Sequence, residues 1–351
     1  MPEPADIEAD GRLTLTRVRQ RLRGKPFGRL ADLVAGLMML EISAVGFLYA
    51  ANVPRLDPIT VWPYWFWSAL FIASALLLSA LLRWRRTVLV VGFALLTGLL
   101  LNEEPWFVLR GLWHDSAQTV EAAGESGDLL QVVTLNTGGG NNEAIRDALA
   151  LEPDIILLQE SPGVGDLERV TPKGWEHAGW SDAAVLVRGN LHASEHTKYL
   201  AHEMYVVRAV PERLGRPLTV ISTHLVLPSL CTDVWRPKVW RDARRLSQSR
   251  GETIQHLLKQ RDRYGDDLPV LIGGDFNTGA GNWLLEPLPA NGLRDVFGAA
   301  GRGWPNTFSD EFPMERIDFI WADSHFRPLD ARVVVTSHSD HRMVMAELLV
   351  Q

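Results

Sequence analysis

Hydrophobic positions divide the chain into two unlike halves. In the first half they form three long apolar stretches, at about 33–53, 62–82 and 87–107. A helix needs roughly 20 apolar residues to cross about 30 Å of hydrocarbon, and the first two stretches supply them. The third has 15 residues before Asn102, so it crosses a bilayer only if it continues through the PWFVL segment. We predict three transmembrane helices within residues 30–110, with a buried soluble helix as the alternative for the third.

Lys and Arg in the short flanking segments predict the orientation of these helices. Segment 1–29 carries seven basic residues and the second loop is the RWRR sequence 83–86, whereas the first loop holds only Arg55 beside Asp57. Because cytoplasmic loops are enriched in Lys and Arg, we expect segment 1–29 and the second loop in the cytoplasm. Three crossings then place everything after residue 110 on the outside. If the third stretch does not cross, that half faces the cytoplasm.

The second half shows a different pattern. Residues 111–127 mix small and acidic residues without periodicity, which indicates a linker. From residue 128 onward, short β-branched and leucine-rich runs are typical of strands, and few helical segments separate them. Many strands with few helices favour stacked sheets flanked by helices over a singly alternating chain. We therefore predict an α/β domain over residues 128–351, preceded by the all-α membrane region.

Charge and cysteine content narrow the class of protein. Residues 1–127 hold 12 basic and 12 acidic residues, whereas residues 128–351 hold 23 and 30, so the formal net charge of −7 belongs to the second half. A protein that neutralises several phosphates of a DNA duplex normally presents a basic face, so this balance disfavours nucleic acid as a partner. The one cysteine, Cys231, excludes an intramolecular disulfide and a multi-cysteine metal site.

Polar residues recur where the predicted strands end. They are Asn136, Glu160, His224, Asp275, Asn277, Asp318, Asp340 and His341. Side chains at strand ends gather at one edge of a sheet, and hard divalent cations prefer the oxygen ligands that carboxylates and amides supply. Each motif alone has an ordinary explanation, because GDFN also forms an Asx-turn and SDH also caps a turn. Six motifs in one order argue instead for a shared site.

The ordered motifs LN, QE, THL, GGDFN, RIDFI and SDH resemble those of the endonuclease/exonuclease/phosphatase superfamily, which has the DNase I-like fold. The resemblance covers residues 128–351. It implies a four-layer sandwich of two packed β-sheets flanked by helices, and a metal-dependent hydrolase of phosphoric esters. Mg²⁺ is the implied cofactor, with Mn²⁺ as an alternative.

The resemblance also implies a metal site. Glu160 would be the principal ligand with Asn136 beside it, and Asp340 would complete the site. A divalent cation on carboxylates neutralises charge on the phosphoryl oxygens, so that no covalent nucleophile is needed.

Catalytic roles follow from the same resemblance. Asp275 would orient or deprotonate the attacking water, and Asn277 would hold the phosphate or the metal. His224 would stabilise the phosphoryl oxygens, and His341 would pair with Asp318 next to the phosphate. An aspartate beside an imidazole fixes its tautomer and favours its charged form. Which residue deprotonates the water stays open.

Three apolar stretches ahead of such a domain, with the TLNTGGGN segment after them, resemble membrane-anchored bacterial members of the superfamily, including proteins tied to glycopeptide-antibiotic resistance. The implied location is the bacterial cell membrane, as a multi-pass protein whose catalytic domain is extracytoplasmic. The superfamily includes nucleases, sphingomyelinases and inositol-phosphate phosphatases, so chemistry alone leaves the substrate open. We expect a membrane lipid or a lipid-linked phosphate or diphosphate, such as an isoprenoid carrier; no protein partner is evident.

Two other functions are compatible with the motifs. One is a metal-dependent endonuclease at the cell surface, which the acidic charge balance disfavours. The other is a non-catalytic membrane sensor with this fold. A domain that had lost catalysis would be expected to lose at least one motif, and all six are present.

Overall fold

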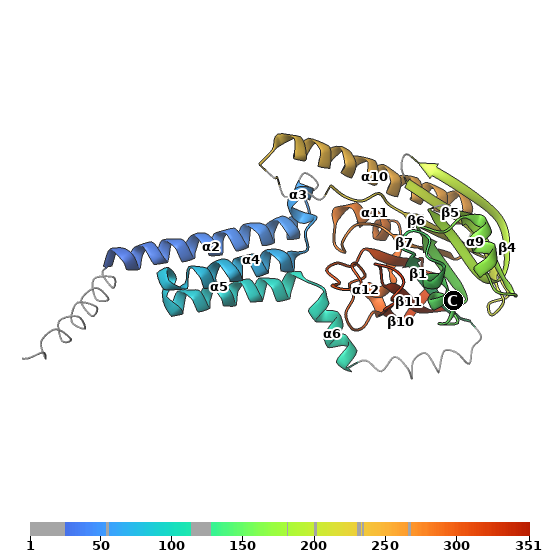
Figure 1. Ribbon diagram of the computed structural model, residues 1–351, viewed down its shortest axis with the longest axis horizontal. Helices are drawn as coiled ribbons and strands as arrows, with labels where there is room; N and C mark the ends of the chain where they lie inside the picture. The colour runs from blue at the N-terminus through green and yellow to red at the C-terminus, as the bar shows by residue number, and fades with distance from the viewer. Residues whose placement is uncertain are drawn as a thin grey trace, which may run out of the picture. The chain divides into compact units, whose positions relative to one another are not determined.

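The chain forms two compact units in this computed structural model (Figure 1). The first comprises the residues up to Ala51 together with Tyr64–Asn102, and the second comprises Asn52–Pro63 and Glu103–Gln351. The structure describes residues 25–53, 56–113, 128–180, 182–199, 202–229, 233, 235–265 and 268–351. Most of the basic segment 1–29, the linker residues 114–127 and Cys231 lie outside the described residues.

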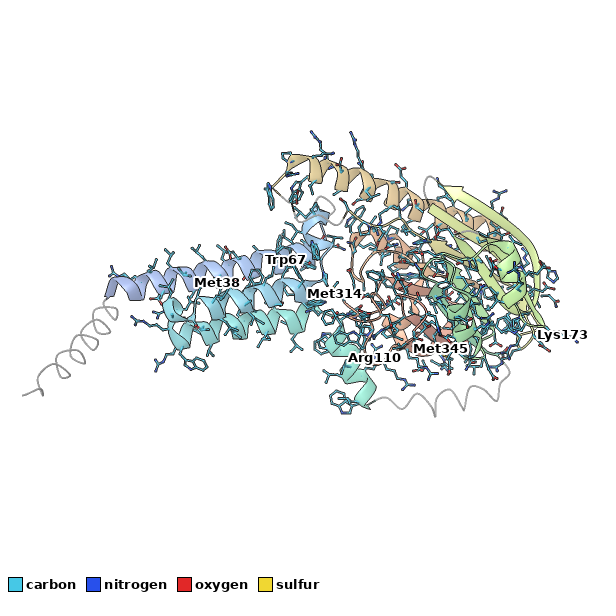
Figure 2. The ribbon with its side chains drawn as sticks, viewed as in Figure 1. Met38, Trp67, Arg110, Lys173, Met314 and Met345 are labelled. Carbon is cyan, nitrogen blue, oxygen red and sulfur yellow. The ribbon has the colours of Figure 1, made fainter. Side chains whose placement is uncertain are left out.

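Three apolar helices form the first unit: α2 (Lys25–Ala51), α4 (Tyr64–Leu77) and α5 (Ser79–Leu101). Both α2 and α4 pack along α5, around a core that includes Met38 (Figure 2). The outer surface of the helices is apolar as well, and the Leu33 side chain is 60% exposed. Helices that are apolar on all sides are suited to lipid rather than to water.

The three helices differ in whether they are long enough to cross a membrane. α2, from Gly28, and α5 are each long and apolar enough to cross a membrane, whereas α4 has 14 residues and reaches about 21 Å. By this criterion the described residues contain two membrane-length helices and a shorter apolar one, not the three expected. The expected third stretch also ends early, because α5 stops at Leu101 and Asn102 caps it.

The backbone of α5 is interrupted within the RWRR sequence. Arg83 is non-helical, with φ 64° and ψ 154°. On its N-terminal side, Leu78 N–H donates to the Ser74 carbonyl and Leu82 N–H donates to the Leu78 carbonyl, so the helical hydrogen bonds of α4 continue to Leu82. The break therefore falls where the sequence predicted a loop between the second and third stretches.

Residues at the end of the expected third stretch form a separate helix, α6 (Glu104–Trp113), within the second unit. Phe107 is 6% exposed and packs edge-to-face on Phe297, with ring centroids 5.0 Å apart. Arg110 on the same helix (Figure 2) donates to the carbonyls of Gly298 and Gly301 at 3.2 Å. The folded unit therefore begins before residue 128, where the sequence had placed its start.

Arg316, just before strand β9 (Asp318–Ala322), binds Glu103, which directly precedes α6. Its guanidinium donates to both carboxylate oxygens of Glu103, at 2.8 and 2.9 Å, and to Asp295 at 3.1 Å. The same group lies 4.5 Å from the ring centroid of Phe319. Burial works against the charge of Arg316, but the two carboxylates outweigh it and raise its pKa. A buried cation needs such partners because desolvation alone would expel it.

The second unit contains two sheets that share one long strand, β4 (Ala183–Tyr199). The first sheet has the order β10 (Phe326–Val334), β11 (Met343–Val350), β1 (Leu129–Asn136), β2 (Ile155–Gln159), β4, with β3 (Trp175–Trp180) also paired to β4. The second has the order β4, β5 (His202–Pro211), β6 (Leu218–His224), β7 (Val270–Asp275), β9 (Asp318–Ala322), β8 (Arg294–Asp295). β4 pairs with β2 up to Val187 and with β5 from Gly189 onward.

Each sheet packs against the other sheet with one face and against helices with its opposite face, because side chains alternate along the strands. On β1, Val132 packs in the core between the two sheets, and its neighbour Val133 packs with α8 (Asn142–Leu149) and α9 (Val164–Val170). On β9, Ile320 joins the core between the sheets and its neighbour Phe319 packs on the side of α10 (Pro237–Gly265). Successive strand residues face opposite sides, so the expected four-layer sandwich is confirmed. Short helices complete the unit: α3 (Asp57–Thr60), η2 (Trp283–Leu285), α11 (Pro287–Ala290) and α12 (Val296–Ala300).

The position of α6 makes a prediction about stability. Replacing Phe107 by alanine is expected to lower the free energy of unfolding of the second unit by about 3–5 kcal/mol, the usual cost of emptying a phenylalanine site in a core. Val108→Ala on the same helix is the matched control, because Val108 is 40% exposed, and it should change the free energy by less than about 1 kcal/mol. Denaturant unfolding of the full chain in detergent measures both. Equal midpoints for the two variants would show that α6 is not part of the folded unit.

Candidate active site

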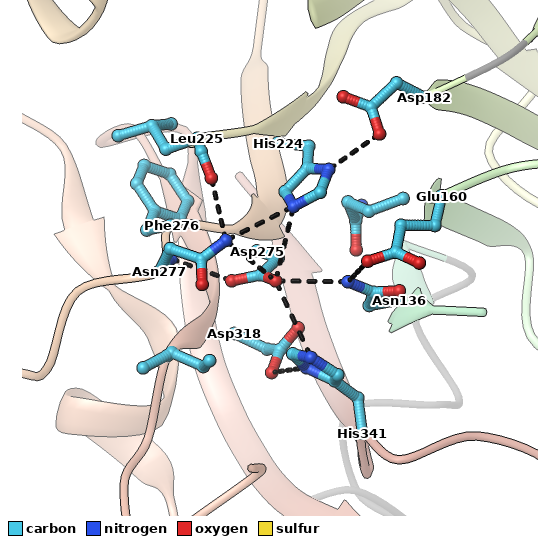
Figure 3. A network of polar contacts seen from close by, with 12 residues as sticks. Asn136, Glu160, Asp182, His224, Leu225, Asp275, Phe276, Asn277, Asp318 and His341 are labelled. Atoms are coloured by element: carbon cyan, nitrogen blue, oxygen red, sulfur yellow. Dashed lines mark hydrogen bonds and ion pairs between the residues drawn. The ribbon is translucent and has the colours of Figure 1, made fainter. Parts of the chain in front are cut away.

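Strand pairing brings the polar motifs to one edge of the sandwich. β1 runs parallel to β2 with Asn136 opposite Gln159, so Asn136 and Glu160 emerge side by side. β6 runs parallel to β7 with His224 opposite Asp275, and β9 runs antiparallel to β7 with Asp318 opposite Asp275. The expected motif residues of each sheet therefore come together at the ends of their strands, as Figure 3 shows.

Asn136 connects the two groups of residues. Its side-chain amide donates to Glu160 Oε1 and to Asp275 Oδ2, at 3.1 Å each (Figure 3). The first of these acceptors follows a strand of the first sheet, and the second ends a strand of the other sheet. One amide thus bridges the sandwich at the centre of the site.

Two motif residues adopt the left-handed backbone region. Glu160 has φ 48° and directly follows β2, and Asn277 has φ 47° and lies just beyond the end of β7. Non-glycine residues enter this region at a cost of about 1–3 kcal/mol and concentrate at functional sites. Glu160 Oε2 also accepts a hydrogen bond of 2.7 Å from Gly139 N–H, which fixes its carboxylate.

Asp275 lies at the centre of the network and is 1% exposed. Its Oδ1 accepts from Asn277 N–H at 2.7 Å. Its Oδ2 lies 3.6 Å from His224 Nε2 and 3.7 Å from His341 Nε2, so an imidazole approaches from either side. Burial and the neighbouring Asp318 carboxylate raise the pKa of Asp275 above its ordinary value.

His341 is held by Asp318. Its Nδ1 lies 2.9 Å from Asp318 Oδ2, and the Phe308 ring packs on the imidazole with centroids 4.8 Å apart. Burial opposes a charge on this histidine, but the Asp318 carboxylate outweighs it and raises the pKa of His341. The two residues that the resemblance paired are thus in hydrogen-bond contact.

His224 has a carboxylate partner that sequence analysis missed. Its Nδ1 lies 2.7 Å from Asp182 Oδ1, and its Nε2 lies 3.2 Å from Asn277 Nδ2. Burial opposes the charge of His224, but the hydrogen bond to Asp182 and the Asp275 carboxylate outweigh it and raise its pKa. Asp182 precedes β4, whose first residue lies opposite Gln159 at the end of β2. The acidic residue before that strand was visible in the sequence, but the antiparallel pairing that carries it to the site was not.

The closely packed acidic group differs from the expected set of metal ligands. Within the described residues, Asp275, Asp318 and His341 offer ligand atoms that all lie within 4.8 Å of one another. Glu160 and Asn136 lie beside this cluster through the Asn136 bridge. Asp340 is exposed and lines a groove of about 430 Å³ together with Glu160.

The donor set fits a hard divalent cation. Asp318 Oδ1 is buried and has no hydrogen-bond partner in the described part of the chain, and a buried carboxylate oxygen without a partner is costly unless a cation satisfies it. Carboxylate oxygens predominate around it, as Mg²⁺ and Mn²⁺ require. With such a cation, the two imidazoles and the Asn277 amide would face the oxygens of a phosphoryl group, and Asp275 would face a water.

Comparison with known proteins agrees with this geometry. The sequence profile of the Endonuclease/Exonuclease/phosphatase family matches residues 133–341. An endonuclease/exonuclease/phosphatase from Bacteroides vulgatus is similar in structure, with a TM-score of 0.51 and 15% identity over 64% of this chain and 99% of that chain. One from Beutenbergia cavernae has a TM-score of 0.50 and 17% identity over 64% of this chain and 72% of that chain.

A mannosyl-6-phosphatase from Bacteroides thetaiotaomicron is also similar, with a TM-score of 0.48 and 17% identity over 62% of this chain and 99% of that chain. No protein with a curated description matches the chain in sequence. The family profile spans more than half of the 351 residues, from strand β1 to His341. The chain therefore belongs to the endonuclease/exonuclease/phosphatase family of metal-dependent phosphoric-ester hydrolases.

Proposed function

We propose that this protein is a membrane-anchored hydrolase that removes phosphate from a lipid-linked phosphate or diphosphate, with an isoprenoid carrier as the substrate class. We further propose that the site lies at the outer face of a bacterial membrane and uses Mg²⁺. The observation that carries the proposal is the combination of an assembled phosphoryl site with an apolar helical unit in one chain.

The chemistry of hydrolysis can be assigned to residues of the chain. A divalent cation bound at Glu160 and its neighbours would neutralise charge on the phosphoryl oxygens. Asp275 would orient the attacking water and accept its proton, because it is buried and its oxygens point into the cluster. His224 and His341, each held at Nδ1 by an aspartate, would donate from Nε2 to the phosphoryl oxygens.

The short connection between the apolar helices and the second unit supports a membrane substrate. α5 ends at Leu101 and α6 begins at Glu104, so only Asn102 and Glu103 connect the apolar unit to the second unit at this point. A catalytic unit that is tied so closely to membrane helices encounters lipid substrates at high effective concentration. The acidic balance of residues 128–351 supports the same choice, because it opposes binding to the polyanionic backbone of DNA.

The break at Arg83 supports an external catalytic unit. Helical hydrogen bonds run from α4 to Leu82, and α5 continues after Arg83 to Leu101. In this proposal the two runs and α2 are three crossings, α4 being lengthened by the hydrogen bonds that continue to Leu82. The positive-inside rule then puts the basic sequence 83–86 in the cytoplasm and the second unit outside.

The first prediction concerns the chemistry. Glu160→Gln, Asp275→Asn and His341→Ala are each expected to lower kcat by at least ~10²-fold, the usual effect of removing one preorganised electrostatic group. Phosphate release by the purified full chain with Mg²⁺ measures the loss, and circular dichroism verifies that each variant is folded. A folded Glu160→Gln variant with wild-type turnover at limiting Mg²⁺ would remove this residue from the metal site.

The second prediction concerns topology. On a Cys231→Ser background, a cysteine in place of Lys173, an exposed residue of the second unit (Figure 2), should react with an impermeant maleimide in intact cells. A cysteine in place of Gln20 should be protected until the cells are permeabilised. Protection of both cysteines would place the second unit in the cytoplasm and would mean that an even number of helices crosses; the opposite labelling pattern would invert the whole topology.

The third prediction concerns the substrate. The full chain should release phosphate from a polyprenyl diphosphate in mixed micelles faster than it nicks supercoiled plasmid, at equal protein and Mg²⁺ concentrations. The Asp275→Asn variant is the control for contaminating phosphatases and should release none above background. Efficient nicking without phosphate release would replace the lipid substrate with DNA and make the protein a nuclease.

A further inference from the structure

A second histidine–aspartate pair lies outside the catalytic cluster, at the groove that Glu160 and Asp340 line. His338 lines this groove of about 430 Å³ with them. Its Nδ1 lies 2.8 Å from Asp147 Oδ2, on helix α8. Because Asp147 occupies Nδ1, Nε2 is the nitrogen left for a ligand, and in the described part of the chain it has no hydrogen-bond partner.

The loop that carries His338 is held in place by hydrogen bonds at several points. Thr336 Oγ1 donates to Asp147 Oδ2 at 2.6 Å and accepts from His338 N–H at 3.2 Å. Asn141 Nδ2 donates to the His338 carbonyl at 2.7 Å. Further along, Ser339 Oγ donates to the Asn136 carbonyl at 2.7 Å, which ties the loop to strand β1. An imidazole on a fixed loop loses little conformational entropy when it binds a ligand.

Glycine keeps the groove open on its other side. Gly138 has φ 63°, and a Cβ at this position would lie 3.2 Å from both Asp340 Oδ1 and Ser339 Oγ. A side chain there would both strain the backbone and crowd the floor of the groove. The opening beside Asp340 therefore depends on this residue having no side chain.

The lining of the groove restricts what can enter it. Every residue that lines it is a glycine or carries a polar side chain; the polar residues include Asn141, Ser337 and His338. Apart from the imidazole of His338, they include no aliphatic or aromatic side chain to pack against an isoprenoid tail. The ligand is therefore the polar end of a substrate.

The groove lies next to the place where the reacting phosphoryl group would bind. Asp275 and His341 are buried, and together with the half-buried His224 they would face the reacting phosphoryl group; none of the three lines the groove. Glu160 belongs to both places, because it lines the groove and is bridged to Asp275 by Asn136. A group in the groove is thus the neighbour of the phosphoryl group under attack.

We propose that His338, held by Asp147, binds the second phosphate of a diphosphate substrate in this groove. The inference rests on the proposed function, which takes a phosphate as the reacting group, and it selects a diphosphate over a monophosphate. Nε2 can pair with a phosphate whichever of the two carries the proton, as donor to P–O⁻ or as acceptor from P–OH. A cation on the neighbouring carboxylates removes their repulsion of the anion.

Binding of inorganic pyrophosphate and orthophosphate to the full chain, by calorimetry in detergent with Mg²⁺, tests this assignment. The wild type should bind pyrophosphate more tightly than orthophosphate. His338→Ala should weaken pyrophosphate binding about tenfold, the usual effect of losing a hydrogen bond to a charged group, and should change orthophosphate binding less than about twofold. Asp147→Ala, which releases the imidazole, should weaken pyrophosphate binding in the same direction.

His325→Ala is the matched control. His325 is also an exposed histidine held by an aspartate, with Nδ1 3.1 Å from Asp323 Oδ2, and its side chain is 45% exposed against 41% for His338. It does not line the groove, so this variant should bind both anions as the wild type does.

Two results would overturn the assignment: a wild type without preference for pyrophosphate, or a folded His338→Ala variant that keeps the preference. Failure of the proposed function has a different signature. If the wild type prefers pyrophosphate, the His338→Ala variant loses this preference, and the wild type hydrolyses no polyprenyl diphosphate, then the assignment of the groove stands and only the proposed lipid substrate is wrong.

Discussion

Two stacked sheets can form one site only where their strand ends are held together, and in this protein the side chain of Asn136 does so. Its amide donates to Glu160 beyond the first sheet and to Asp275 at the end of a strand of the second, at 3.1 Å each. An amide suits this place because it donates to two carboxylates at once without adding charge. The other polar residues of the site lie around these two carboxylates: Gly139 donates to Glu160, and Asn277, His224 and His341 surround Asp275.

The electrostatics of the centre follow from the same constraint. Asp275 and Asp318 are buried next to each other, which raises the pKa of Asp275, while the aspartate partners of the two histidines raise theirs. Each imidazole therefore lies between a carboxylate that holds it and the shared carboxylate of Asp275. This arrangement concentrates proton donors and acceptors around a buried carboxylate, and such preorganised groups act most strongly on a developing charge where the surroundings are of low polarity.

The start of the second unit at Glu103 is likewise built around a buried charge with carboxylate partners. Arg316 lies two residues before Asp318, and its guanidinium binds Glu103 and Asp295 and packs on the Phe319 ring. Glu103 and Phe107 immediately follow the last apolar helix. Of the first residues after that helix, Phe107 is therefore part of the core, and Glu103 binds Arg316, just before the strand that begins with Asp318.

Local properties of the sequence determined most of the architecture. Apolar runs and their alternation predicted the helical first half and the stacked sheets, and the motif residues could be named because each stands at the end of such a run. Contacts between distant segments were decided only by the tertiary structure. Asp182 meets His224 through the antiparallel pairing of β4 with β2, Glu103 meets Arg316 across more than 200 residues, and Asp147 on α8 meets His338 on the last loop. The physical reason is that burial periodicity is a property of neighbouring residues, whereas the partner of a charged side chain depends on which elements pack together. The same reason explains the boundary at residue 128: the sequence marks where apolar residues end, but only packing shows that Phe107 belongs to the core of the second unit.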